Sequence, residues 1–349
     1  MDSGVTWQEL GGRTADLVIE GLDQYRGWFQ STLVTSVADR GTAPFKRILV
    51  HGFPVDEHGR KMSKSAGNMV DPKTIIDGSA DIKMRGTDLL RTGTLHENPI
   101  CGENILATYN EEVRRLSSIM RFMLGCLSDY DPAKDAPNFS DLYMFDRFAL
   151  HRLFAYDQNA WINYELLQYH KVARETVSFI TTQLSKLYFP SIKHRLYCLP
   201  RNSLERRSAQ HVLHCVLQCL LLTMTPIVPH LTHEVARHLT PGESPQLKIR
   251  SPLPLEYHNP HLEELLAPCL RVREQLFSLQ ALSYPALTTT KLDLTLSAVS
   301  PAYEALTVSK TTERELLRLV HIVRHSSSSE CHHHPSINRR VNVFLNQLL

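Results

Sequence analysis

A glycine-flanked basic loop between an apolar run and a helix start is the feature that most restricts the fold of this chain. The run Arg47–Gly52 has the character of a buried strand, and Asp71-Pro72 supplies an N-cap residue followed by the proline favoured in a first helical turn. Between them lies Lys61-Met62-Ser63-Lys64-Ser65, with Gly59 before it and Gly67 after it. Glycine permits turns that other residues resist, so both ends of the segment are able to bend. A strand, a basic loop and a helix N-terminus in this order are typical of an anion-binding site.

The two lysines of this loop are candidates for holding a polyphosphate. Lys61 and Lys64 are point charges on flexible stems, and serine hydroxyls and backbone N–H groups nearby offer further donors. The alternative is a solvated basic loop without a ligand. A P-loop is excluded, because that motif needs four residues between its glycines and a lysine directly after the second one.

The region before the loop predicts a β-α-β unit. Residues 16–20 form a strand ending at Glu20, a helix is expected over 23–40, and residues 47–52 form the second strand. Ligands bind at the carboxyl ends of parallel strands, where Glu20, His51 and Gly52 are placed. The alternative for Glu20 is a carboxylate that interacts with the dipole of the following helix. Trp28 and Phe29 are expected in the middle of that helix, packed against the sheet.

The rest of the chain predicts a helix bundle. Apolar residues recur with helical spacing over 113–127, 142–153, 169–187 and 212–224, with an N-cap expected at Ser140. A strand-like stretch over 291–298 and a helix over 312–323 follow. No apolar run reaches the length of a membrane span, so no membrane partner is expected.

Composition restricts the partners and the compartment. The net charge of 349 residues is only +2, so RNA binding must come from local patches. The seven cysteines form no C-x-x-C pair, which argues against a zinc site and for a reducing compartment, and Cys215 and Cys219 are interpreted as small buried hydrophobic residues. The run Cys331–His334 is interpreted as part of a low-complexity tail and not as a metal site.

Two segments carry a resemblance to a known family. Lys61–Ser65 resembles the KMSKS signature of class I aminoacyl-tRNA synthetases, and Glu20–Ser31 resembles the matching block of isoleucyl-tRNA synthetases. Gln30-Ser31 and Ser65–Asn68 are similar to the bacterial and mitochondrial branch. The resemblance runs, with gaps, from about residue 13 to about residue 239. Valine and leucine synthetases are the alternatives within the class.

The resemblance implies a two-step ATP-dependent reaction. Isoleucine and ATP, with Mg²⁺, give isoleucyl-adenylate and pyrophosphate, and the acyl group then passes to tRNA-Ile. Lys64, with help from Lys61, is expected to stabilise the leaving pyrophosphate, and Glu20 to bind the adenylate. Asp23, Gln24, His51 and Gly52 are further candidates for the adenylate site. A monomer in the mitochondrial matrix is expected, with the cytoplasm as the alternative compartment.

Departures from the family limit this expectation. The sequence contains no HIGH motif, no editing insertion and no terminal zinc module, and it supplies only the second half of the Rossmann-like sheet. A half sheet has an uncovered face and edge. We therefore expect this C-terminal portion not to adenylate isoleucine by itself. Residues 77–98 also depart from the family, which questions the helix that buttresses the loop. A non-catalytic tRNA-binding module is the alternative function.

The expected fold is α/β followed by all-α. The expected boundaries are a partial catalytic domain over 1–92, a connecting helical region over 93–135, an anticodon-binding bundle over 136–250, a small mixed region over 251–325 and a disordered tail over 326–349. Candidate RNA contacts are exposed basic and aromatic residues, namely Arg114, Arg115, Arg121, Arg195 and Tyr197. For the first three, a solvated helix face without RNA is an equal alternative.

Overall fold

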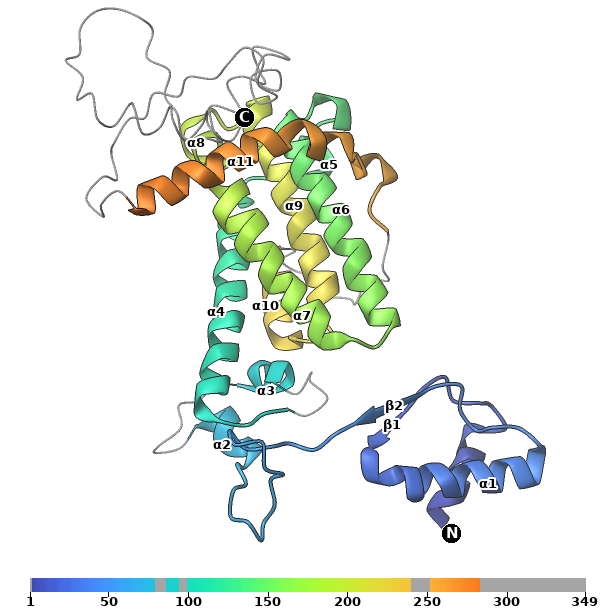
Figure 1. Cartoon of the computed structure of the whole chain (residues 1–349). Helices are drawn as coiled ribbons and strands as arrows, with labels where there is room; N and C mark the ends of the chain where they lie inside the picture. The colour runs from blue at the N-terminus through green and yellow to red at the C-terminus, as the bar shows by residue number, and fades with distance from the viewer. Residues whose placement is uncertain (1, 79–85, 94–98, 240–251, 283–349) are drawn as a thin grey trace, which may run out of the picture. The chain divides into compact units, whose positions relative to one another are not determined.

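The computed structural model of this protein describes residues 2–78, 86–93, 99–239 and 252–282 (Figure 1). The chain divides into two compact units. The first contains residues 1–124, 158–177 and 220–248, and the second contains the remainder. The architecture is α/β followed by all-α, as predicted. The expected strand over 291–298, the helix over 312–323 and the tail lie outside the described residues.

The first unit contains the predicted β-α-β element, after a 3-10 helix at its start. Strands β1 and β2 pair in parallel, with Val18 opposite Ile48 and Gly21 opposite His51. The chain reaches the second strand through a short 3-10 helix and α1 (Figure 1). The bounds of these elements are η1 Asp2–Leu10, β1 Val18–Gly21, η2 Leu22–Arg26, α1 Trp28–Arg40 and β2 Ile48–His51.

The single helix expected over 23–40 is interrupted at Gly27. The Gln24 amide oxygen accepts the backbone N–H of Trp28 at 2.9 Å and thereby caps the start of α1. A Cβ atom on residue 27 would lie 2.8 Å from that oxygen, so a larger residue there would displace the Gln24 side chain from this hydrogen bond. The side chain of Gln24 thus starts a second helix at Trp28, which places Trp28 and Phe29 in the first turn.

The two-stranded sheet is more exposed than the apolar sequence of its strands predicts. Ile19 is 54% exposed and Ile48 is 38% exposed, so the expectation of buried strands is wrong. Because Ile48 is paired with Val18, Ile48 and Ile19 lie on opposite faces, so the exposure is not confined to one face of the sheet. Phe29 is buried and packs edge-on against Phe45, whereas Trp28 is only partly buried and donates its indole N–H to the Ser3 carbonyl at 2.7 Å.

A small core follows the basic loop. Asp71 caps α2 as predicted, by accepting the N–H of Lys73 at 2.8 Å. The buried side chains of Ile75, Leu89 and Leu106 join α2, α3 and α4 into one apolar cluster. The bounds of these helices are α2 Pro72–Asp77, α3 Thr87–Gly93 and α4 Glu103–Cys126.

Residues of the second unit form part of the predicted bundle. Helices α6 and α9 lie side by side, and Leu150, Leu153, Leu213 and Val216 are fully buried (Figure 1). The N-cap expected at Ser140 is wrong, because α6 begins only at Met144. The bounds are α5 Pro132–Asp135, η3 Phe139–Asp141, α6 Met144–Glu165, α7 Tyr169–Ser178, η4 Phe179–Tyr188, α8 Phe189–Cys198, α9 Leu204–Met224, α10 Pro229–Leu239, η5 Leu255–Tyr257 and α11 His261–Leu282.

One stretch of the bundle is not an α-helix. Residues Phe179–Tyr188 form a π-helix between α7 and α8, which helical periodicity did not predict. The Ser185 hydroxyl donates to the carbonyl of Ile180, five residues back, at 2.8 Å. Within the parts of the chain that the structure describes, none of the helices has the length and apolar character needed to cross a membrane.

Candidate functional site

The strand ends place the first group of candidate residues. Glu20 lies opposite Val50, one position before the pair Gly21–His51. Glu20 and His51 are exposed, and the His51 Nδ1–H donates to the Gly52 carbonyl at 2.9 Å. The structure thus brings Glu20, His51 and Gly52 to the carboxyl ends of adjacent parallel strands, where ligands bind in such sheets.

Asp23 and Gln24 lie directly after the first strand. A Cβ atom on Gly21 would lie 2.7 Å from the Oδ1 atom of Asp23, so a larger residue there would displace the Asp23 carboxylate. Gln24 donates its amide to Asp23 at 3.2 Å while its oxygen caps Trp28. Gln24 therefore has a structural contact that the sequence did not reveal, and a ligand would meet an amide that is already engaged.

The basic loop follows a tight hairpin formed by residues 55–61. Val55 and Lys61 form an antiparallel bridge, and the Met62 N–H donates to the Pro54 carbonyl at 3.0 Å. Gly59 closes the turn with φ of 75°, a conformation that suits glycine. At the other end, the Gly67 N–H donates to the Lys64 carbonyl at 3.2 Å, and φ of Gly67 is 65°. Both glycines that flank the loop thus serve turns.

Asp56 and Asn68 join the two ends of this loop, and the sequence did not predict a role for either residue. Asn68 donates its amide to Asp56 Oδ2 at 3.1 Å and to the Lys61 carbonyl at 3.4 Å. The Asn68 Oδ1 atom accepts the Ser63 N–H at 3.0 Å. The only sequence signal was an asparagine and an aspartate flanking a glycine-bounded turn.

The two candidate lysines differ in their surroundings. The Lys61 ammonium lies 3.5 Å from the centre of the Phe53 ring, a cation–π contact. The Phe53 Cζ and His51 Cε1 atoms lie 3.8 Å and 3.7 Å from the position of a Cβ atom on Gly21. Phe53 thus connects Lys61 with the strand ends. Lys64 is exposed, and no hydrogen bond or ion pair joins it to Glu20 in this described region.

Helix α3, the second helix after the loop, is attached to the start of α10 and to the residues before it. The buried Asp88 carboxylate of α3 accepts the N–H groups of His230 and Leu231 at 3.2 and 2.8 Å, at the start of α10. Arg91 donates to the carbonyls of Ile227 and Pro226. The two N–H groups that Asp88 accepts are among those that the start of a helix leaves unsatisfied. The segment 86–93 is therefore anchored and contains a helix, α3, within the stretch 77–98 for which the sequence questioned one.

The candidate RNA-contacting residues differ in their exposure to solvent. Arg114, Arg115 and Arg121 are exposed on α4, where Arg114 pairs with Glu111 at 3.0 Å. Tyr197 is 65% exposed. Arg195 is 6% exposed and forms an ion pair with the buried Asp146, so the expectation that it faces RNA is wrong. A carboxylate in the bundle core keeps this arginine inside.

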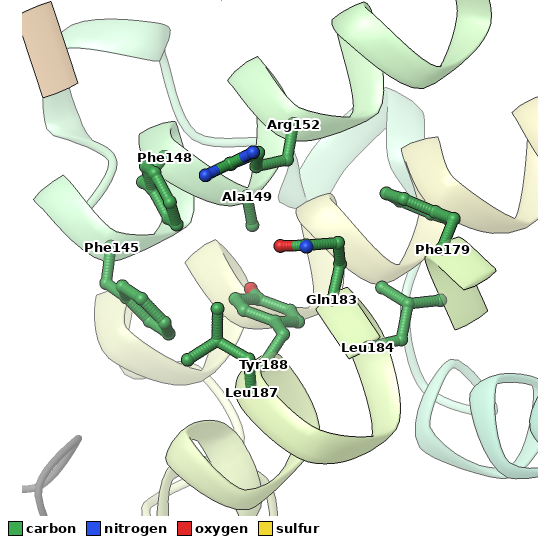
Figure 2. A pocket seen from close by; sticks show the side chains of 9 residues that line it. All are labelled: Phe145, Phe148, Ala149, Arg152, Phe179, Gln183, Leu184, Leu187 and Tyr188. Carbon is green, nitrogen blue, oxygen red and sulfur yellow. The ribbon is translucent and has the colours of Figure 1, made fainter. Parts of the chain in front are cut away.

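A small cavity lies between α6 and η4. Its volume of about 10 Å³ is enough for one water molecule at most. Figure 2 shows the polar ends of Arg152 and Gln183 near the aromatic rings that line it. Because this volume is far smaller than a nucleobase, the cavity is not a site for one. The described residues also contain no group of three or more metal-ligating side chains, and Cys331–His334 lies outside them.

Comparison with known proteins identifies two family regions. Residues 5–131 match the family described as tRNA synthetases class I (I, L, M and V), and residues 146–279 match the anticodon-binding domain of tRNA ligase. The isoleucine–tRNA ligase of Gloeobacter violaceus is 40% identical over 251 residues, which are 68% of this chain and 26% of that protein. The mitochondrial isoleucine–tRNA ligase of Mus musculus is 37% identical over 261 residues, 72% of this chain and 26% of that protein.

Solved structures agree with the fold. A ternary LeuRS–tRNA–LeuAMS complex from Agrobacterium radiobacter K84 matches 70% of this chain and 30% of its own, with a TM-score of 0.54 and 17% identity. Mycobacterium tuberculosis methionyl-tRNA synthetase, in complex with methionyl-adenylate, matches 63% of this chain and 43% of its own, with a TM-score of 0.51 and 19% identity. The chain spans about a quarter of the length of the curated relatives that it matches.

Proposed function

We propose that this chain, a class I tRNA synthetase catalytic-domain fragment joined to an anticodon-binding domain, is the pyrophosphate-releasing and tRNA-binding part of an isoleucine–tRNA ligase. The observation that carries the proposal is the position of Lys61. Its ammonium rests on Phe53, next to the strand ends that present Glu20 and His51. Relatives named isoleucine–tRNA ligase support the choice of amino acid.

In the proposed first step, the carboxylate of isoleucine attacks the α-phosphate of ATP. Isoleucyl-adenylate forms, the bond between the α- and β-phosphates breaks, and pyrophosphate leaves with the electron pair. Lys64 and Lys61 neutralise the charge that develops on this leaving group, and they need no proton transfer to do so. Mg²⁺ would arrive bound to the phosphates of ATP, because such ions are held mainly through substrate phosphates.

In the proposed second step, a terminal ribose hydroxyl of tRNA-Ile attacks the adenylate carbonyl and AMP leaves. Glu20 holds the adenylate, with hydrogen-bonding groups of Asp23, His51 and Gly52 beside it. The Gln24 amide also lies there, but it already donates to Asp23 and accepts the N–H of Trp28. No protein nucleophile takes part. The anticodon-binding region supplies the remaining tRNA contacts through exposed residues such as Tyr197.

A chimeric enzyme tests the catalytic role. Residues 5–282 of this chain replace the matching part of the mouse mitochondrial relative, and isoleucine-dependent ATP–pyrophosphate exchange is measured. We expect exchange, and a fall of roughly 100-fold on Lys64→Ala, because an electrostatic contact of the transition state is removed. Exchange that does not respond to Lys64→Ala or Lys61→Ala would contradict the proposed roles. The purified 349-residue chain is expected to show no exchange.

A non-catalytic tRNA-binding module is the second candidate. The observation that favours it is that the bundle has a fully buried core, whereas the two-stranded sheet that would carry the catalytic site is exposed. Filter binding with tRNA-Ile at varied salt, alongside the chimera, separates the two candidates. A chain that binds tRNA but whose chimera is inactive supports the module. Failure to bind tRNA at low salt counts against both.

The compartment and the oligomeric state belong to the same proposal. Mitochondrial relatives of Mus musculus and Gallus gallus, 37% and 39% identical, support a mitochondrial location, and a bacterial relative at 40% identity supports the alternative of the cytoplasm. We propose the mitochondrial matrix and a monomer. Fractionation of source cells with an antibody tests the compartment. Light scattering after size-exclusion chromatography measures the mass in solution and so tests the monomer. A dimer would indicate that two chains associate, as an exposed sheet edge allows.

A further inference from the structure

The base of the basic loop is fixed by the rest of the fold. The Val55 N–H donates to the Pro99 carbonyl at 2.9 Å, and the Cys101 N–H donates to the Val55 carbonyl at 2.8 Å. The Glu57 carboxylate accepts the N–H of Asn104 at 3.3 Å, in the first turn of α4. The hairpin that carries Asp56 is thus attached to the segment that leads into α4.

Asp56 is the point on this hairpin where hydrogen bonds converge. Its carboxylate is buried and accepts the N–H groups of His58 and Arg60 at 3.0 and 2.9 Å and the Arg60 Nε–H at 2.8 Å. The Asn68 amide adds a fourth hydrogen bond at 3.1 Å. This last bond, more than the others, holds the pKa of Asp56 well below its usual range. Asp56 is therefore a charged acceptor with a fixed position.

Asn68 connects Asp56 to the loop by hydrogen bonds. Its amide group reaches Asp56 and the Lys61 carbonyl, and its oxygen accepts the Ser63 N–H. One side chain thus contacts both sides of the segment that carries the two lysines. We call this set of contacts between the two side chains the Asp56–Asn68 clasp.

We infer that Asp56 and Asn68 are positioning residues, which hold the loop so that Lys61 and Lys64 receive a diphosphate group. This inference rests on the proposed function, because it takes pyrophosphate as the ligand of the loop. Two glycines flank the segment, so without the clasp the lysines would sample many arrangements. The apparent affinity of a ligand falls in proportion to the fraction of the protein in the competent conformation.

Trypsin cleavage of the full chain tests the inference, because trypsin cuts after lysine and both lysines lie in the loop. Cleavage at Lys61 and Lys64 is followed by mass spectrometry with increasing inorganic pyrophosphate. Asn68→Ala removes two donated hydrogen bonds and one accepted one. We expect it to raise cleavage in the absence of ligand roughly tenfold and to weaken protection by pyrophosphate by a similar factor.

Four further variants, among them Asp56→Ala by itself, make the test specific. Lys64→Ala removes a ligand cation without touching the clasp, so it should reduce protection while leaving ligand-free cleavage at Lys61 unchanged. Asn110→Ala, in α4 outside the loop, is the matched control. In the variant that combines Asp56→Ala with Asn68→Ala, the change in pyrophosphate affinity should be no larger than that of the more severe single variant, because both act through one contact.

The outcomes separate the inference from the proposed function. If pyrophosphate protects the wild type and Asn68→Ala with equal affinity, the positioning role is wrong and the proposed function stands. If pyrophosphate protects neither, and Lys64→Ala behaves as the wild type does, the role of the loop in the proposed function is overturned and the inference falls with it. Weaker protection of Asn68→Ala, with normal Asn110→Ala, supports the positioning role.

Discussion

Asp146 accepts two hydrogen bonds from the guanidinium of Arg195 inside the bundle. The Nη1 atom lies 2.7 Å from Oδ2 and the Nη2 atom lies 2.6 Å from Oδ1. The Tyr188 hydroxyl donates to Oδ1 at 2.7 Å, and the Ser208 hydroxyl also donates to this carboxylate. Because Asp146 is fully buried, each of these donors offsets part of the cost of removing a charge from water. The pair links α6 to α8 and α9.

Replacement of Arg195 by alanine should destabilise the bundle strongly. The change leaves a buried carboxylate without its cation, so we expect the free energy of unfolding to fall by about 3–5 kcal/mol in urea titrations. Arg201→Ala is the control. Arg201 pairs with Asp129 at 3.1 Å, but its side chain is 69% exposed, so a loss of about 0–1 kcal/mol is expected. Equal losses in the two variants would contradict the structural role of Arg195.

Stability should depend on pH through His151. Its Nδ1 atom accepts the Asn259 N–H at 3.1 Å, and its Nε2 atom lies 3.2 Å from Glu263. Burial lowers the pKa of His151, and electrostatic interactions with His258 and Arg152 act in the same direction, against the opposing effect of the Glu263 carboxylate. The folded chain therefore binds a proton on this imidazole only at a lower pH than the unfolded chain, whose histidine has the ordinary pKa of 6.5.

The sign of the pH effect follows from this difference. Below 6.5 the unfolded state binds more protons, so the contribution of His151 is complete above 6.5 and is lost as the pH falls toward the lower folded pKa. Urea titrations between about pH 5 and pH 8 should show this slope, and His151→Asn should flatten it. Burial also lowers the pKa of His211. The variant that combines His151→Asn with His211→Asn should therefore show a still smaller slope of stability against pH. An unchanged slope in His151→Asn would refute the assignment.

Cysteine reactivity should follow exposure. Burial raises the pKa of the Cys215 thiol to about 11, and its Sγ atom lies 3.6 Å from the Tyr257 hydroxyl. Cys219 is buried, and Cys198 is exposed. Because the thiolate is the reactive form, iodoacetamide near neutral pH should modify Cys198 at least roughly tenfold faster than Cys215 or Cys219. Mass spectrometry of the native chain measures this difference, which should disappear in urea.

The α4 arginines should contribute to tRNA affinity if the helix contacts phosphates. Each phosphate contact steepens the dependence of log K on log salt by about 0.7–0.9. We therefore expect the combined replacement of Arg114, Arg115 and Arg121 by alanine to reduce the slope by about 2 to 3. Arg237→Ala, an exposed arginine on α10, is the control. An unchanged slope would favour the alternative of a solvated helix face.

Several elements could be predicted because their signals are local. The strand order, the Asp71 cap and most helices depend on residues within a few positions of one another, and the KMSKS-like segment is continuous in the sequence. The helix break at Gly27 was missed because it depends on where the Gln24 side chain folds back. The domain boundaries and the roles of the site residues stay predictions.

Residue order by itself determined the β-α-β element, the helical character of the bundle and the two lysines that mark the loop. Only the tertiary structure decided that Arg195 is buried while Tyr197 is exposed, although both lie in α8. It also decided that Asn68 meets Asp56 across the loop. The physical reason is that local conformation depends on neighbouring residues, whereas burial and hydrogen-bond partners depend on where distant segments pack.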